Sequence, residues 1–192
     1  MPVRKTSAET VKSSLWSGGA TTEYFIYPPE ASYAARDFEV RISMAQVDES
    51  PSTFTALAGF HRLLMPLSAP LRLVFAKAEE VSLQPLETTS FDGGIETVSH
   101  GVCTDFGIMH TDKWVAQLVA LPDGTYPLGS KFSFVYAVND GGTISWDTEE
   151  ESGSQALKKG DFILFEDIYS GEIQITGLGQ EMVVAGRIVA AQ

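Results

Sequence analysis

The chain has 192 residues, 44% of them hydrophobic, and carries a formal net charge of −12 at pH 7. This composition is typical of one or two small globular domains and excludes a disordered tail. Because so acidic a chain repels phosphate groups, we expect no sequence-independent binding to nucleic acid and no attachment to anionic membranes.

The chain offers no signal for secretion or for a structural metal. Its single cysteine, Cys103, cannot form an intramolecular disulfide, and no Cys or His cluster accompanies it. Residues 1–16 lack the apolar core of a signal peptide, and no apolar run approaches the ~18 to 20 residues that cross a bilayer. We therefore expect a soluble cytoplasmic protein.

Strand signals dominate the first part of the chain. Short runs of β-branched and aromatic residues alternate with Gly, Pro, Asn or Asp, and only residues 9–15 favour a short helix. Apolar residues occupy every second position of residues 38–44. This alternation predicts a strand in which Glu39, Arg41 and Ser43 share one face.

The later segments continue this pattern. Residues 60–65 break the alternation, as expected for a strand that is buried on both faces. Asn139-Asp140-Gly141-Gly142 contains residues that tolerate positive φ, and it predicts a β-hairpin between strands 131–138 and 143–146. Together these signals predict an all-β barrel or sandwich. Further strands are predicted at 71–75, 114–121, 162–165, 172–176 and 182–189.

Two segments share a layout that indicates a duplicated barrel. In residues 86–96 and again in residues 157–165, a leucine and an acidic glycine turn precede a strand. No linker separates the two halves, so they are expected to be tightly associated and able to exchange strands. We place the N-terminal half at residues 1–111 and the C-terminal half at residues 112–192.

The histidines do not have the spacing of a metal site. His61, His100 and His110 lie far apart in sequence, and the His-x-His pair of catalytic cupin barrels is absent. The chain also lacks a phosphate-binding loop, a dinucleotide fingerprint and a Gly-x-Ser-x-Gly elbow. We therefore expect no metal and no other cofactor. Cys103 lies in an apolar stretch, where an inert buried thiol is the ordinary role.

Arg41 and Arg62 are the strongest candidates for a binding role. An arginine inside a strand of a chain poor in basic residues is exposed, paired with a carboxylate or reserved for an anionic ligand. An ion pair with Glu39 or Asp105 is the structural alternative, and the sequence leaves it open.

Several blocks occur in an informative order along the chain. They are Trp16-Ser17-Gly18-Gly19-Ala20-Thr21-Thr22-Glu23, residues 38–47 followed by 52–62, and Phe91-Asp92-Gly93-Gly94 leading to residues 104–109. In this order the blocks resemble the HutD/Ves family. The C-terminal part is similar to cupins only through Leu157 and the Gly160-Asp161 pair.

The resemblance implies a cupin-superfamily bicupin, with two β-barrel or jelly-roll halves that lack the metal ligands of catalytic cupins. It also implies a role in sensing a small metabolite or in regulation, connected with histidine utilisation. Two residues depart from the family pattern, because Gly94 and Gly107 stand where polar side chains are typical. The ligand of this chain is therefore expected to be a variant of the family's ligand, or to be absent.

The leading hypothesis is a metal-free bicupin that binds a small anionic or zwitterionic metabolite. The arginines would pair with its charge, polar side chains would orient it, and aromatic side chains would form apolar walls. The predicted ligand-binding residues are Arg41, Arg62, Ser43, Thr22, Asp105, Trp16, Phe60 and His61.

Two other functions compete with this hypothesis. A metal-independent isomerase or lyase could use His61 or His110 as a general base in the same barrel. A structural or partner-binding protein is favoured if the barrel interior is packed. The exposed strands of cupin-like sheets also allow pairing into a homodimer.

Overall fold

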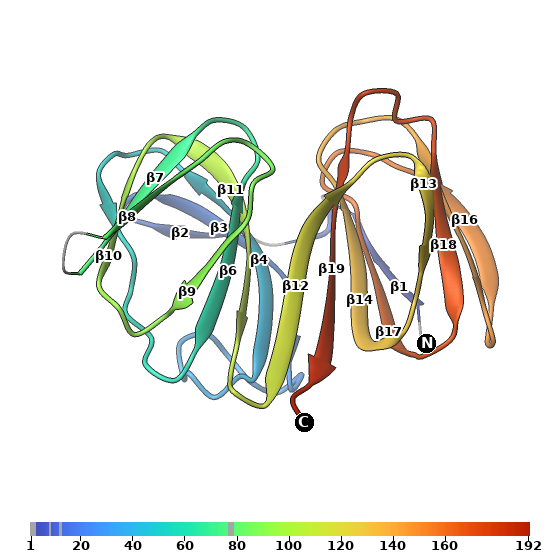
Figure 1. The fold of residues 1–192 in the computed structure, drawn as a ribbon, viewed down its shortest axis with the longest axis horizontal. Helices are drawn as coiled ribbons and strands as arrows, with labels where there is room; N and C mark the ends of the chain where they lie inside the picture. Colours follow the sequence, from blue (N-terminus) through green and yellow to red (C-terminus); the bar gives the residue numbers. More distant parts are fainter. Residues whose placement is uncertain (1–2, 8, 12, 77–78) are drawn as a thin grey trace. The chain divides into compact units, whose positions relative to one another are not determined.

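A computed structural model describes residues 3–7, 9–11, 13–76 and 79–192 of the chain. Within these residues the regular secondary structure consists of nineteen strands, in agreement with the all-β prediction (Figure 1). The described part of the chain contains no helix of the length and apolarity that spanning a membrane requires. The strands form two compact units, which we call the N-terminal unit, residues 11–116, and the C-terminal unit, residues 117–190 together with the strand at the start of the chain.

The N-terminal unit consists of two antiparallel sheets. The larger sheet has the order β2 (Ser13–Trp16), β3 (Gly19–Tyr27), β4 (Val40–Val47), β11 (Cys103–His110), β6 (His61–Pro66) and β9 (Thr89–Asp92). The smaller sheet has the order β5 (Ser52–Thr53), β10 (Thr97–His100), β7 (Leu71–Phe75) and β8 (Glu80–Leu83).

The C-terminal unit has a corresponding pair of sheets. The larger sheet has the order β1 (Val3–Thr6), β17 (Phe162–Ile168), β14 (Ser130–Ala137), β19 (Val183–Ala190) and β12 (Trp114–Leu121). The smaller sheet has the order β13 (Gly124–Pro127), β18 (Gly171–Thr176), β15 (Thr143–Thr148) and β16 (Ser152–Ala156). The first strand of the chain, β1, therefore pairs with β17 near the other end of the sequence.

The two units share one topology. The order β4-β11-β6-β9 recurs eight strands later as β12-β19-β14-β17, and β5-β10-β7-β8 recurs as β13-β18-β15-β16. Even a local turn is repeated, because Leu86 N–H donates to the Pro66 carbonyl and Gly160 N–H donates to the Ala137 carbonyl, each at 2.8 Å. Leu86 and Gly160 also share a left-handed backbone, with φ of 70° and 86°. These correspondences allow positions in the two units to be matched.

Two local predictions are wrong. Residues 9 and 10 form a turn and Ser13 to Leu15 lie in β2, so the segment predicted as a helix is instead held in register by β3. The turn at residues 139–142 exists, but β14 pairs with β17 and β19 whereas β15 pairs with β16 and β18. The turn thus connects two sheets and not two paired strands, because the sheet that buries each strand's apolar face decides its partner.

The two units fill their interiors differently. In the C-terminal unit, apolar side chains from both sheets form one continuous core, which includes Ile144, Trp146, Phe165 and Val183. Two apolar clusters among the described residues of the N-terminal unit, one around Leu73 and one around Phe38, contain fewer buried side chains than this core. Polar side chains occupy part of its interior instead, and they surround a cavity.

Candidate functional site

The central strands of the N-terminal unit place polar side chains on one face. Strand β11 lies between β4 and β6, and alternate residues of all three strands point to the same side. Across the sheet these residues form three rows: Arg41, Met109 and Arg62; Ser43, Gly107 and Leu64; and Ala45, Asp105 and Pro66. The predicted shared face of Arg41 and Ser43 follows from this alternation.

This face forms the floor of a cavity of about 960 Å³, which we call the arginine pocket. Gly107 lines this pocket in the row between the two arginines and Asp105, and it places no side chain there. The functional side chains that line the pocket are Trp16, Glu23, Tyr33, Arg41, Ser43, Phe54, Arg62 and Asp105.

Arg41 is held by neighbours on its own sheet. Its Nε donates to Glu23 Oε2 at 2.7 Å, and its Nη1 donates to Ser43 Oγ at 3.2 Å. The guanidinium carbon lies 4.4 Å from the centre of the Tyr33 ring. Glu23 reaches this face because β3 has a bulge between Glu23 and Phe25, which changes the side to which the residues before it point. The ion pair suggested with Glu39 is not formed, since Glu39 bonds to Lys113 and Trp114.

Arg62 has weaker compensation for its burial. Its Nη2 donates to the Thr55 carbonyl at 2.5 Å, and its guanidinium carbon lies 5.5 Å from the centre of the Phe54 ring. Within the described residues its Nε has no hydrogen-bond partner and its guanidinium is in ion-pair contact with no carboxylate. Burial lowers the pKa of Arg62 and the charge of Arg41 lowers it further, while Tyr33 and Asp105 act in the opposite direction.

Asp105 is the buried acid of the pocket, with only 6% of its surface exposed. Among the described residues its carboxylate accepts no hydrogen bond. Burial raises the pKa of Asp105 to about 7, although the positive charge of Arg62 acts to lower it. Burial, with a contribution from Asp105, also raises the pKa of Cys103 to about 12, so this thiol stays neutral and is a poor nucleophile.

The structure brings together five of the predicted site residues and separates three. Arg41, Ser43, Arg62, Asp105 and Trp16 line the arginine pocket. Thr22 points away from it and shares a hydrogen bond of 2.7 Å with the hydroxyl of Ser13. Phe60 packs against Phe38, with ring centres 4.4 Å apart, and His61 lies in a second pocket.

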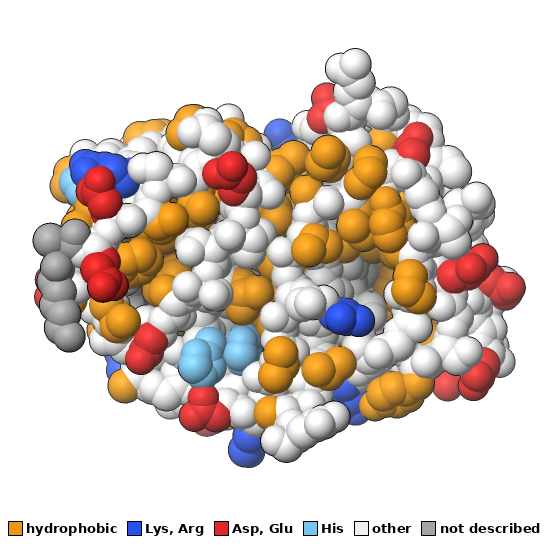
Figure 2. Space-filling view, viewed as in Figure 1, with side chains coloured by type: hydrophobic (Ala, Val, Ile, Leu, Met, Phe, Trp, Pro, Cys, Tyr) orange, Lys and Arg blue, Asp and Glu red, His pale blue; other side chains and the backbone are white. Residues whose placement is uncertain are grey.

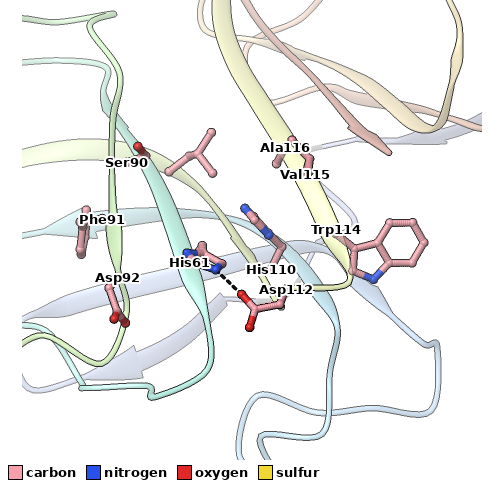
Figure 3. Close-up of a pocket in the computed structure, with 10 residues that line it drawn as sticks. His61, Ser90, Phe91, Asp92, His110, Asp112, Trp114, Val115 and Ala116 are labelled. Carbon is pink, nitrogen blue, oxygen red and sulfur yellow. Dashed lines mark hydrogen bonds and ion pairs between the residues drawn. The ribbon is translucent and has the colours of Figure 1, made fainter. Parts of the chain in front are cut away.

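The second pocket, of about 510 Å³, contains both His61 and His110 (Figure 3). His61 Nε2 and Asp112 Oδ1 are 2.5 Å apart, while His110 Nδ1 lies 3.0 Å from the Thr111 carbonyl. The two histidine rings lie 5.2 Å apart, and Figure 2 shows a pair of neighbouring histidines at the surface. Burial lowers the pKa of His110, an effect that the charge of His61 strengthens. In the part of the chain that the structure describes, no three His, Cys, Asp or Glu side chains are placed to hold a metal ion.

Sequence reasoning missed several lining residues. Three of them, Glu23, Phe54 and Thr55, lie inside the sequence blocks that carry the family resemblance. The resemblance therefore pointed to these segments, but it did not predict that these side chains line the pocket. Tyr33 lies in the segment between β3 and β4, where no pattern of hydrophobic periodicity could single it out.

Comparison with known proteins supports this fold. A structure of a conserved protein of unknown function, PA5104 from Pseudomonas aeruginosa PAO1, is 21% identical, with a TM-score of 0.84 over 97% of this chain and 98% of that one. HutD from Pseudomonas fluorescens SBW25, in a formate condition, is 18% identical, with a TM-score of 0.78 over 99% and 100% of the two chains.

More distant structures share the architecture. The formate complex of oxalate decarboxylase from Lactobacillus farciminis is 9% identical, with a TM-score of 0.62 over 96% of this chain and 85% of that one. These likenesses confirm the predicted all-β cupin-type fold with two halves. A search of curated proteins finds no match. The sequence model of the HutD family matches residues 8–184, which is most of the chain, and the protein therefore belongs to the HutD family.

Proposed function

We propose that this protein binds a small anionic or zwitterionic metabolite in the arginine pocket and needs no metal to do so. The observation that carries the proposal is the convergence of Arg41 and Arg62, each 7% exposed, on a cavity inside the N-terminal unit. Burying a guanidinium costs free energy unless hydrogen bonds and opposite charge compensate it. An anionic ligand would supply the compensation that Arg62 lacks.

The C-terminal unit provides an internal comparison. Asp105 pairs with Pro66, and Val183 pairs with Ala137 at the matching place of the second unit. Val183 is 1% exposed and belongs to the packed core there. The same topology can therefore have an apolar interior, and the charged interior of the N-terminal unit favours a binding role over a purely structural one.

The chemistry of the pocket favours a carboxylate. A guanidinium offers paired N–H donors that match two carboxylate oxygens, and the Ser43 hydroxyl lies beside Arg41. Trp16, Tyr33 and Phe54 add aromatic surface for the rest of a metabolite. The HutD structure of Pseudomonas fluorescens is described as a formate condition and the oxalate decarboxylase structure as a formate complex, so formate is a suitable first carboxylate to test.

A thermal-shift screen of formate and the carboxylates of amino-acid pathways tests the proposal. A ligand at 100 times its dissociation constant should raise the free energy of unfolding by about 2.7 kcal/mol. Arg62→Gln should abolish this shift. Arg72→Gln is the matched control, because Arg72 is an exposed arginine of β7 that pairs with Glu80. Equal shifts in wild type and Arg62→Gln for every carboxylate would contradict the proposal.

We propose further that ligand binding serves regulation of amino-acid use, with histidine utilisation as the process that the family name suggests. A cytoplasmic location suits such a role. In this case the purified protein should release its ligand unchanged after prolonged incubation, which NMR of the recovered ligand measures.

The hydrogen-bonded His61 and Asp112 favour one enzymatic alternative. A carboxylate that orients an imidazole is a common arrangement for a general base, and this pair opens into the second pocket. Turnover of a carboxylate that is lost in His61→Gln and kept in Arg62→Gln would favour this alternative, because the histidines and the arginines line different pockets.

A further inference from the structure

Asp105, like Arg62, is an ionisable group of the arginine pocket that has no ion-pair partner among the described residues. It lies on β11 with Gly107 and Met109, which also line the cavity, and its side chain is more than nine-tenths buried. Within the described residues no donor bonds to its carboxylate, and it makes no ion-pair contact with Arg62. The carboxylate therefore faces the space in which a ligand of the arginines would lie.

Charged and titratable groups face Asp105 from each neighbouring element. Arg62 of β6 is the cation that acts on it most directly, and the thiol of Cys103 lies on its own strand. The remaining groups are Arg41 of β4, Glu23 of β3, and Tyr33 and Glu49 from the segments before β4 and β5. Glu23 is paired with Arg41 and 36% exposed, so Asp105 is the acid of this set that is both buried and unpaired.

We propose that Asp105 determines which ligands this pocket accepts: in the complex it carries a proton and donates it in a hydrogen bond to the anionic group held by Arg62. The proposal rests on the proposed function. The proton comes from solvent, and binding takes it up only in those molecules whose Asp105 was ionised before the anion bound. No covalent bond forms or breaks.

The physical reason is the repulsion between two buried anions. An ionised Asp105 next to a bound carboxylate would place like charges in a medium of low polarity, where one of them takes up a proton. Protonation replaces this repulsion with an O–H donor directed at the ligand. The pKa of about 7 in the free protein means that the proton is available near neutral pH.

The proposal predicts how affinity depends on pH. If only protein with protonated Asp105 binds the anion, the apparent dissociation constant is the intrinsic one divided by the protonated fraction. With a midpoint near pH 7, affinity for an anion should fall about tenfold between pH 6 and pH 8. A ligand that donated an N–H group to ionised Asp105 would show the opposite slope.

The experiment is an amide chemical-shift titration with sodium formate at pH 6, 7 and 8 and constant ionic strength, because formate stays ionised throughout this range. Wild-type protein should bind formate about tenfold more weakly at pH 8 than at pH 6. Asp105→Asn should bind with the same affinity at all three pH values. Asp48→Asn, an exposed aspartate outside the pocket, should behave as wild type does.

The outcomes separate this inference from the proposed function. Formate binding that is lost in Arg62→Gln but independent of pH in wild type overturns the role of Asp105 and leaves the proposed function intact. Formate binding that Arg62→Gln does not weaken overturns both. If Asp105→Asn fails to fold, the carbon-13 signal of the Asp105 carboxyl group in wild type decides: its midpoint should rise when formate saturates the protein, and an unchanged midpoint overturns the inference.

Discussion

Arg41 and Arg62 lie in the same row of the sheet, on either side of Met109, but their surroundings differ. Arg41 has a carboxylate and a hydroxyl as partners, whereas Arg62 has one backbone carbonyl, the Tyr33 side chain and the Phe54 ring beside it. Removing Arg41 would also leave Glu23 without its partner. Arg62 is therefore the cleaner position at which to test ligand binding.

Asp105 should make the free protein less stable as pH rises. Its pKa is higher in the folded chain, at about 7, than the ordinary value of 3.8, so the folded chain holds more protons between these pH values. The free energy of unfolding should then fall by about 3 kcal/mol from pH 4 to pH 7 through this group alone. Urea denaturation at both pH values measures the effect.

Asp105→Asn should remove this part of the pH dependence. The variant cannot ionise at this position, so its stability relative to wild type should increase from pH 4 to pH 7. A difference between the two proteins that stays constant over this range would show that Asp105 titrates normally in the folded chain.

At the scale of elements, the turn between β14 and β15 combines two glycines with different surroundings. Gly141 and Gly142 both have positive φ, 107° and 79°. An added Cβ at Gly141 meets nothing within 4 Å, whereas at Gly142 it lies 2.6 Å from the Leu178 Cδ2 atom. The first position thus needs glycine for backbone conformation alone, and the second also for space.

Gly141→Ala should lower the free energy of unfolding by about 1 kcal/mol, which is the usual cost of placing a Cβ at positive φ. Gly142→Ala should cost more, because Leu178 has to move as well. Thermal denaturation of the two variants side by side measures the difference. Equal losses would mean that the turn relaxes without disturbing Leu178.

At the scale of the whole molecule, the apolar core around Ile144 and the arginine pocket belong to different units. Ile144 is fully buried in the apolar core of the C-terminal unit, while the arginine pocket is lined by the N-terminal unit. Ile144→Ala should cost about 2 to 5 kcal/mol of stability through the cavity it leaves. Where the variant is still folded, its affinity for formate should equal that of wild type, which a chemical-shift titration checks. Weakened binding would mean that the pocket depends on this core.

Local patterns in the sequence were enough for several of the strands and for part of the site. Alternation in residues 38–44 correctly placed Arg41 and Ser43 on one face of β4, since side chains two apart in a strand always share a side. The broken alternation of residues 60–65 correctly indicated the burial of β6. These features depend only on neighbours along the chain, so they could be predicted without the fold.

The remaining features of the site depend on the pairing of strands that are distant in sequence. The approach of Arg41 and Arg62 depends on β11, which lies between their strands although it comes much later in the sequence than either. The bulge in β3 brings Glu23 to Arg41, and the choice of sheet separates β14 from β15. His61 lies one residue from Arg62, yet alternation directs it to another pocket. Register and sheet membership reflect which faces are buried together, and this burial depends on contacts between strands that are distant in sequence.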